Sequence, residues 1–488
     1  MSKLIEIDPI TRLEGHGKIE IFMDDNGEVE KAYYSIPELR GFEVFSRGKM
    51  AENMPQITSR ICGVCPTAHH MASTRALDSL YNVEPTEAAH ALREMLYNMF
   101  MFEDHTLHFY ILGGPDFIVG PTAPAAERNI LGVIGKVGVE TGRKVIEIRR
   151  KVRELMTWLT GKVIHPVWGL PGGVSKGMTK DKQKEFIAVA KECVEFAAFT
   201  KQTLKDIVLS NKEYLDLILS DMYTHKTYYM GLVDEQNKVN FYRGKIRVVD
   251  PEGKEFVKFD VKDYQEHLSE HVEQWTYVKF LFLKNIGWNG FIDGAESGVY
   301  SVAPMARLNV SDGFTTPKAQ EEYEEYVSTF KMKPVHHTLA NHWARVIEIM
   351  YASERFLELA SSDLVLSEDL INRNYDVPSE GFGVVEAPRG TLFHHLKTDE
   401  KGLITDANLL VATQNNAARI AMSVEKAAKG LIHGADVDQG TLNMIEMAFR
   451  AYDPCNACST HTAPGRFPLE LNFRDSSNGK VVKSIRNY

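Results

Sequence analysis

Cysteine is scarce in this sequence, which has five among its 488 residues. A secreted disulfide scaffold needs many cysteines in a short chain, so that class is excluded. Long apolar runs are also missing: no stretch of about 18 apolar residues occurs, so we expect no membrane span. The N-terminus lacks the apolar core of a secretion signal, and we expect a cytoplasmic protein. Lys and Arg total 56 against 66 Asp and Glu, and this acidic balance excludes a basic nucleic-acid-binding surface.

A dinucleotide-binding fingerprint is absent as well, because Gly172, Gly173 and Gly177 do not have the required spacing. We find no internal repeats and no low-complexity linkers. What the sequence does have is apolar content, with 44% hydrophobic residues, which is enough for a large buried core.

Two patterns alternate along the chain. Apolar residues at strand spacing flank the turn Asp25-Asn26-Gly27, and we predict strands in 17–22, 28–36, 226–262 and 381–396. Apolar residues at helical spacing predict helices in 86–112, 121–160, 180–211, 263–286, 334–362, 407–434 and 441–451. Long helices with one apolar face pack as bundles. We therefore predict an α+β fold, mainly α, in which a central long-helix bundle carries small peripheral antiparallel sheets.

Four of the five cysteines form two Cys-x-x-Cys pairs, Cys62 with Cys65 and Cys455 with Cys458. Cys193 lies in an apolar helical pattern, which predicts a buried structural thiol. Thiolates bind soft and borderline metals, so two pairs that meet can hold metal with four sulfurs. Structural zinc, an iron–sulfur cluster and a redox metal such as nickel all remain open, as does a fold in which the pairs never meet. Structural zinc pairs usually lie about 15–20 residues apart, whereas nearly the whole chain separates these two.

The residues that flank the cysteines resemble a known family, the large subunits of nickel–iron hydrogenases. The similar segments follow the family's order and are DPITRLEGH (8–16), RGFE (40–43), RICGVCP (60–66), EAPRG (386–390) and DPCNACSTH (453–461). The resemblance implies the family's fold and its activity, the reversible heterolytic cleavage of H2 to protons and electrons.

Because the cysteine pairs lie at opposite ends, we expect a single interlocked catalytic unit over residues 1–488. Its expected parts are a β-rich N-terminal part (1–60), a helical bundle (86–220), a small sheet insertion (226–262), helices with the C-terminal metal motif (263–461) and a C-terminal extension (462–488).

By this resemblance, the first cysteine of each pair binds nickel alone and the second bridges nickel and iron. The expected metal ligands are Cys62, Cys65, Cys455 and Cys458. The iron would also carry one carbon monoxide and two cyanides. The thiolates and cyanides outweigh the charge of two divalent metals, so the buried centre needs a compensating cation. Arg389 is the expected cation, lying with Pro388 in a loop over the metals and near one cyanide.

The resemblance assigns further side chains around the metals. Thr413 would hydrogen-bond the second cyanide, His69 would hydrogen-bond a bridging sulfur, and Asp104 and Asp453 would surround the arginine. We interpret the paired histidines at 336–337 and 394–395 as structural.

Heterolytic cleavage also needs a proton acceptor, and a carboxylate that carries the proton outward. By resemblance Cys455 accepts the proton and Glu14 relays it. Glu43 and His461 match ligands of a separate magnesium-type ion, which prefers carboxylate and water oxygen.

The implied enzyme needs partners, because this chain has no further cysteines for an electron relay. We expect the obligate partner to be an iron–sulfur small subunit, with Arg60 toward that interface, and we expect further flavin and iron–sulfur subunits. The iron–sulfur clusters lie in the partners and none lies in this chain. The segment VATQNN (411–416) resembles the soluble, multimeric, cofactor-coupled group, whose acceptors are NAD(P), a deazaflavin, ferredoxin or a heterodisulfide reductase.

Two rival functions are a structural zinc or iron–sulfur protein, and an electron-transfer scaffold like the quinone-binding subunit of respiratory complex I. The latter resembles this family but lacks the four cysteines. The extension 462–488 has strand-like segments at 468–473 and 481–485 around Asn478-Gly479, which predicts a hairpin. It fits either an uncut precursor, from which a protease removes the tail, or a subgroup that keeps it.

Overall fold

A three-stranded antiparallel sheet opens the chain of this computed structural model. Its order is β1 (Leu4–Ile7), β2 (Lys18–Met23) and β3 (Val29–Ser35). The last two are the predicted strands, and Gly27 in the turn between them has a φ of 84°, which favours glycine. We did not predict β1, because four residues are too short to show a period. The structure describes residues 4–434, 437–461, 470–476 and 480–486.

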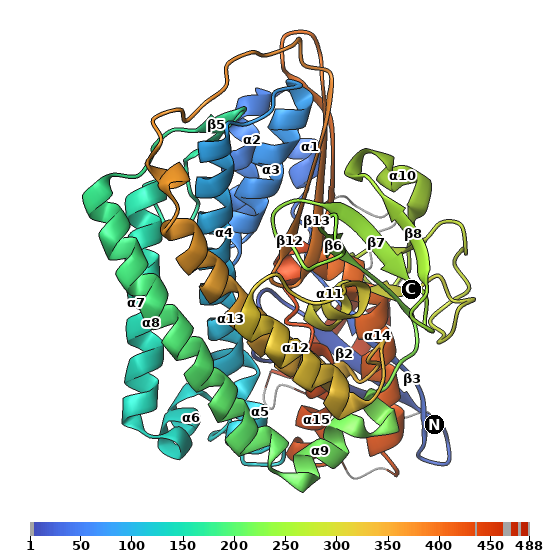
Figure 1. The fold of residues 1–488 in the computed structure, drawn as a ribbon. Helices are drawn as coiled ribbons and strands as arrows, with labels where there is room; N and C mark the ends of the chain where they lie inside the picture. The colour runs from blue at the N-terminus through green and yellow to red at the C-terminus, as the bar shows by residue number, and fades with distance from the viewer. Residues whose placement is uncertain (1–3, 435–436, 462–469, 477–479, 487–488) are drawn as a thin grey trace.

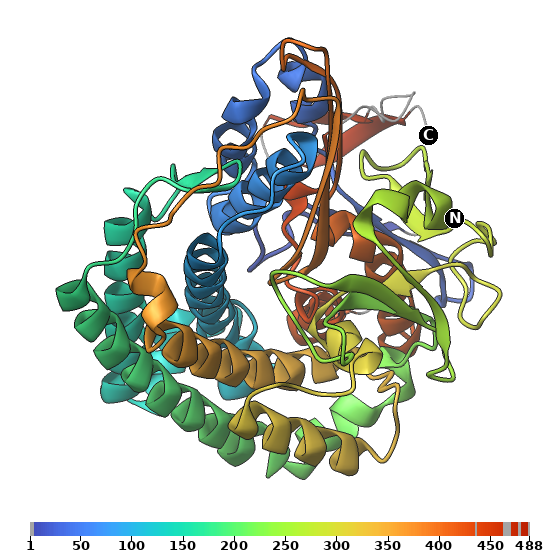
Figure 2. The same ribbon diagram turned by 45° about the horizontal axis from the view of Figure 1, so that its top comes forward.

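Long helices make up one side of the molecule and enclose α4 between themselves and the sheets (Figures 1 and 2). Helix α13 packs against both α4 and α8. The longer helices are α3 (Pro66–Leu80), α4 (Glu87–Leu107), α7 (Val139–Thr160), α8 (Lys180–Leu204), α12 (Pro317–Phe330), α13 (Asn341–Ala360), α14 (Ala412–Leu431) and α15 (Gln439–Arg450). The shorter ones are α1 (Phe42–Ser46), α2 (Met54–Thr58), α5 (Gly114–Ile118), α6 (Ile130–Val137), α9 (Lys212–Leu219), α10 (Tyr264–His267) and α11 (Pro304–Val310).

Two predicted helical segments differ in the structure. The segment 121–160 contains two helices, α6 and α7, because Gly138 between them has a φ of 90° and ends the first. The segment 263–286 is mostly not helical, so that prediction was wrong. After the one-turn α10, β9 (Leu268–His271) pairs antiparallel with β10 (Phe280–Leu283). The short apolar run FLFL suits a helix or a strand, and packing of Phe280 against neighbouring aromatic rings decides for the strand.

The predicted sheet in 226–262 is present as β6 (Tyr228–Val233), β7 (Lys245–Val249) and β8 (Glu255–Phe259). A short strand, β11 (Tyr300–Ser301), pairs parallel to β6. The other strands are β4 (Gly169–Leu170), β5 (Gly173–Val174), β12 (Glu380–Ala387), β13 (Gly390–Thr398), β14 (Ile404–Leu410), β15 (Glu470–Arg474) and β16 (Val481–Arg486).

The tight turn between β12 and β13 carries Pro388 and Arg389. Gly390 follows it with a φ of 129°, and a Cβ there would lie 2.4 Å from the carbonyl oxygen of Val302. Only glycine fits so close to another backbone, and this explains the EAPRG segment in physical terms.

The predicted C-terminal hairpin is confirmed in part, since β15 pairs antiparallel with β16. The predicted positions 468–469 and 478–479 lie outside the described residues, as does 462–467. Arg486 at the end of β16 forms an ion pair with Glu6 of β1 at 3.4 Å.

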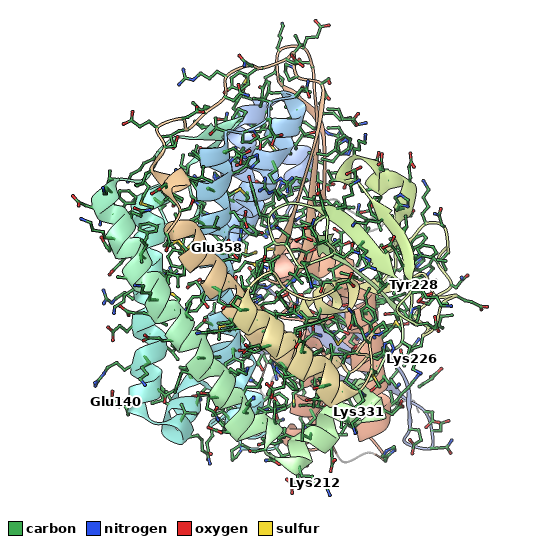
Figure 3. The ribbon with its side chains drawn as sticks, viewed as in Figure 1. Glu140, Lys212, Lys226, Tyr228, Lys331 and Glu358 are labelled. Carbon is green, nitrogen blue, oxygen red and sulfur yellow. The ribbon has the colours of Figure 1, made fainter. Side chains whose placement is uncertain are left out.

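One hydrophobic core runs from Ile61 to Cys458 and includes Cys62, Cys65 and Cys455. The outer face is charged, as the exposed side chains of Glu140, Lys212 and Lys331 illustrate (Figure 3). In the described ranges, no helix combines the length and apolarity needed to cross a membrane. The mainly helical α+β class with small sheets is confirmed.

Candidate metal centre

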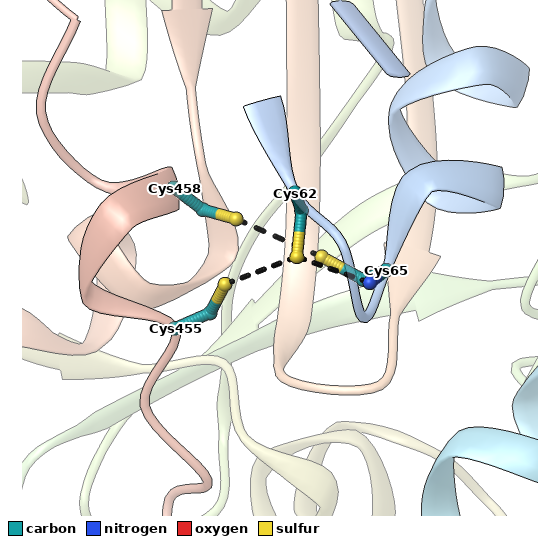
Figure 4. A group of neighbouring side chains, drawn as sticks. All are labelled: Cys62, Cys65, Cys455 and Cys458. Carbon is teal, nitrogen blue, oxygen red and sulfur yellow. Dashed lines mark hydrogen bonds between the residues drawn. The ribbon is translucent and has the colours of Figure 1, made fainter. Parts of the chain in front are cut away.

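The two cysteine pairs meet, although they stand at opposite ends of the chain (Figure 4). The sulfurs of Cys62 and Cys455 lie 3.4 Å apart, and those of Cys65 and Cys458 lie 3.7 Å apart. All four sulfurs lie within 4.8 Å of one another and all four residues are buried. We call this group the cysteine tetrad. It rules out the alternative in which the pairs never meet.

Backbone contacts hold each pair in place. Cys65 stands at the start of α3, and its amide donates to the Cys62 sulfur at 3.1 Å. On the other side, the Asn456 amide donates to the carbonyl oxygen of Glu14 at 2.9 Å. The Arg40 guanidinium donates to backbone carbonyls of both cysteine motifs, those of Ile61 and Ala457. We assigned Arg40 no role from the sequence, because a motif match does not show which carbonyls a side chain reaches.

The tetrad titrates as one unit. Burial alone would raise the pKa of Cys62, but hydrogen bonds from Cys455, Cys458 and Cys65 hold it well below its usual value. Burial raises the pKa of Cys455 and Cys458 well above theirs. A metal that binds four thiolates must therefore displace protons from this group, which is the usual coupling of metal binding to pKa.

Glu14 lies against the tetrad and is half-buried. Its Oε2 accepts a hydrogen bond from the Cys455 sulfur at 2.9 Å and another from the Ala457 amide at 3.3 Å. Burial, followed by the charge of Cys62, raises the pKa of the Glu14 carboxyl. The arrangement suits a group that exchanges a proton with Cys455.

Arg389 is fully buried above the tetrad with two acids beside it. Its Nη1 donates to Asp104 Oδ2 at 3.2 Å, and its Nη2 lies 2.9 Å from Asp453 Oδ2 in an ion pair without hydrogen-bond alignment. Burial raises the pKa of Asp104 to about 7 even though Arg389 opposes it. The structure thus brings together the three charged residues that the resemblance grouped.

Thr413 and His69 also lie where the resemblance placed them. The Thr413 hydroxyl accepts a hydrogen bond from the Cys455 amide at 2.9 Å, and its own hydrogen stays free to donate. His69, one turn into α3, is buried, and its Nδ1 lies 3.2 Å from Nε2 of His394. Burial lowers the pKa of His69 to about 4, so the ring is neutral. We interpreted His394 as structural and did not foresee this contact.

The predicted magnesium ligands show no direct contact with each other. Glu43 on α1 accepts from the Leu409 amide at 2.8 Å, and burial raises its pKa to about 7. His461 packs edge-on against Phe42, with ring centroids 5.8 Å apart, and its Nδ1 has no protein partner. Phe42 thus places His461 beside the residue that precedes Glu43.

The tetrad fits a thiolate-bound metal centre. Among the residues that the structure describes, it is the one group of three or more His, Cys, Asp or Glu side chains that could share an ion. Buried polar atoms around it lack protein partners, among them Arg389 Nε, Asp104 Oδ1 and His69 Nε2. Unpaired buried polar atoms are costly, and a bound group with polar ligands would satisfy them. Sulfur geometry alone, however, suits zinc as well as nickel.

The fold and the tetrad define a metalloprotein with a buried centre of four thiolates. The chain belongs to the nickel-dependent hydrogenase family, whose profile matches residues 40–129 and 295–461, while a HoxL-like profile matches residues 4–39. It is therefore a hydrogenase large subunit with a nickel–iron site.

Individual relatives agree with this assignment. The chain is 48% identical to the iron-sulfur subunit of an F420-non-reducing hydrogenase from Archaeoglobus profundus, over 100% of both chains. It is 34% identical to the NAD-reducing hydrogenase HoxS subunit beta of Cupriavidus necator, again over 100% of both. A crystal structure of an NAD+-reducing [NiFe]-hydrogenase in the H2-reduced state superposes with a TM-score of 0.88 and 33% identity, covering 94% of this chain and 99% of that one.

Proposed function

We propose that this subunit carries out reversible heterolytic cleavage of H2, with Cys455 and Glu14 as the first two proton carriers. The hydrogen bond between the Cys455 sulfur and Glu14 Oε2 carries the proposal. When bound, the nickel–iron centre supplies the cleavage itself and takes up the electrons. The protein's own part is to remove the proton: a thiolate accepts it, and a carboxylate in contact accepts it next. Glu14 is half-buried, so it can pass the proton toward the surface.

We assign the first cysteine of each pair, Cys62 and Cys455, to nickel alone, and the second, Cys65 and Cys458, to both metals. The assignment rests on the family resemblance and on the closeness of the four sulfurs. The tetrad can hold two ions only if some sulfurs are shared, because two separate tetrahedral sites would need more ligands.

The polar atoms around the tetrad support an iron that carries one carbon monoxide and two cyanides. Arg389, carried with Pro388 on the β12–β13 turn, would donate to one cyanide, and its charge offsets the negative centre. Thr413 would donate its free hydroxyl hydrogen to the other. Asp104 and Asp453 then fix the direction of the guanidinium.

We further propose that His69 donates to a bridging sulfur through its unpaired Nε2, and that Glu43 and His461 bind a magnesium ion. The carboxylate of Glu43 suits a hard divalent cation. A cation would also keep Glu43 ionised, whereas burial alone favours its neutral form. His461 Nδ1 has no protein partner, which leaves one ring nitrogen for a ligand or a water.

Electrons must leave through a partner, because Cys193, the fifth cysteine, is buried in α8 away from the tetrad motifs. We propose that this partner is an iron–sulfur small subunit, with further flavin or iron–sulfur subunits that pass electrons to NAD(P) or ferredoxin. The relatives support a multisubunit enzyme, since their names describe subunits of F420-non-reducing and NAD-reducing hydrogenases. We propose a cytoplasmic enzyme, and a single catalytic unit rather than separable domains.

The test is isotope exchange by the purified complex. Incubated under H2 in D2O, it should release HD and D2 detectable by mass spectrometry, and it should reduce a viologen dye only when H2 is present. Dye reduction without exchange would contradict heterolytic cleavage at this centre. A complex inactive in both assays although it contains nickel would contradict the function itself.

A further inference from the structure

We infer that Arg307 is a positioning residue that holds the Arg389 loop in register over the cysteine tetrad. The inference rests on the proposed function, because it matters to catalysis only if Arg389 faces a nickel–iron centre. Arg307 lies on α11, far from either cysteine motif in sequence, and no motif in the sequence marked it. Its guanidinium is fully buried, and so are both of its carboxylate partners, Glu348 and Glu386.

Every N–H group of the Arg307 guanidinium has an acceptor. Nε and Nη2 donate to the two carboxylate oxygens of Glu348, each at 2.6 Å. Nη1 donates to Glu386 Oε2 at 3.0 Å. The remaining two hydrogens reach backbone carbonyls, that of Ala387 at 2.9 Å and that of Pro388 at 3.1 Å. A planar fork with five donors is what only arginine offers.

These contacts fix the residues that lead directly into Arg389. Residues 386, 387 and 388 each bind Arg307, one by its side chain and two by their carbonyls. The carbonyl oxygen of Arg389 itself accepts from Asn416 Nδ2 at 2.8 Å, and Asn416 Oδ1 accepts from the Val302 amide at 2.9 Å. The turn therefore has little freedom to shift along or away from the tetrad.

Neighbouring residues on α4 hold the two ends of this clamp. Asp104 accepts from the Arg389 side chain at 3.2 Å. The next residue, His105, lies 2.8 Å from Glu348 Oε2, which in turn holds Arg307. The contacts thus form a closed ring from α4 through Glu348 and Arg307 to the turn, and back through Arg389 to α4. The ring sets the backbone and the side chain of Arg389 against the same helix.

Lysine at position 307 would keep the positive charge but lose the fork. A single ammonium cannot bind Glu348 through two nitrogens and still reach two carbonyls and Glu386. We expect the turn to move slightly, and with it the Arg389 guanidinium. Small misplacements of a group next to reacting atoms reduce turnover strongly even when substrate binding is unchanged.

Arg93 provides a matched control elsewhere in the fold. It is also fully buried, it binds both oxygens of Asp78 at 2.6 and 3.2 Å, and it donates to the carbonyls of Leu170 and Gly173. It therefore clamps a turn in the same way, between β4 and β5, but that turn carries no residue of the tetrad. Arg93→Lys reports the cost of losing such a clamp without disturbing Arg389.

The experiment compares purified complexes that carry Arg307→Lys or Arg93→Lys with wild type. The readouts are nickel content, melting temperature, the infrared cyanide and carbon monoxide bands, and kcat and KM for H2. We expect both variants to keep nickel and melt earlier. Only Arg307→Lys should shift the cyanide bands and lower kcat about 10- to 100-fold with KM unchanged. Unshifted bands in Arg307→Lys, or equal shifts in both variants, would overturn the inference.

Two arms keep the outcome decisive. If Arg307→Lys does not retain nickel, Glu348→Gln keeps Arg307 but weakens its anchor, and it should shift the same bands in the same direction; unshifted bands there would also overturn the inference. The wild-type spectrum separates the two claims. A wild-type complex without cyanide bands contradicts the proposed function, whereas normal wild-type bands with an unaffected Arg307→Lys spectrum contradict only the role of Arg307.

Discussion

The Cys455 sulfur donates a hydrogen bond of 2.9 Å to Glu14 Oε2, and this contact joins the buried tetrad to a half-buried carboxylate. A backbone bond from the Asn456 amide to the Glu14 carbonyl, 2.9 Å long, fixes the two segments against each other. The first and last motifs of the chain thus form one proton-transfer unit.

Glu14→Gln should keep the metals and nearly abolish turnover. Glutamine preserves the shape and can still hydrogen-bond Cys455, but it cannot accept a proton. We expect H2-dependent dye reduction to fall about 10²- to 10⁴-fold, the range of general acid–base contributions. Glu38→Gln, at a neighbouring acid that accepts from the His16 amide, should retain activity. Full activity in Glu14→Gln would remove Glu14 from the path.

Thr413→Val should destabilise the protein around the second cysteine motif. Valine has nearly the same shape, but it leaves the buried Cys455 amide without the acceptor it has at 2.9 Å. An unsatisfied buried donor costs about 1–3 kcal/mol, so the melting temperature should fall by several degrees. Thr413→Ser restores the hydroxyl and should recover most of the loss. Equal melting of valine and serine variants would contradict the role of this bond.

Glu43→Gln should remove bound magnesium and leave nickel in place. The carboxylate is the charged ligand proposed for this ion, and an amide binds a hard divalent cation less well. Elemental analysis of the purified complex measures both metals at once. Asp406→Asn is the control, because this nearby acid also acts on the charge of Glu43. Magnesium that persists in Glu43→Gln, or is lost equally in Asp406→Asn, would count against the site.

Glu322 makes stability depend on pH away from the metals. Burial raises its pKa from 4.5 to about 7, with Lys201 opposing. The folded state therefore binds this proton more tightly than the unfolded state, so the stabilisation is complete below about pH 4.5 and is lost as pH rises through about 7. Glu322→Gln should raise the melting temperature at pH 8, by up to about 3 kcal/mol of stability, and change little at pH 5.

The control for that measurement is Glu321→Gln, at an exposed position on the same helix α12. Its effect should be small at both pH values. If Glu322→Gln changed the melting temperature equally at pH 5 and pH 8, the glutamate would not be neutral in the folded protein.

Much of the site could be predicted from sequence, because its chemistry is written in short motifs. The tetrad, Glu14 and Arg389 lie in such segments, and the structure brings them together. Arg307 and Glu348 could not be found in this way. Each is a single polar residue in an apolar helical pattern, and its importance arises only when α11, α13 and the β12–β13 turn pack together.

The fold shows the same division. The strands around Gly27 and the long helices follow local periodicity, which the sequence displays directly. The segment 263–286 does not, because its buried FLFL run takes its form from Trp275 and Phe291, contacts that no local pattern reveals.

The most direct test of the whole account is the metal content of the purified complex, measured by elemental analysis against the concentration of this chain. The account predicts one nickel ion per chain, with loss of nickel when Cys62 or Cys455 is replaced by serine. Stoichiometric zinc without nickel would contradict it, since the tetrad would then be a structural site.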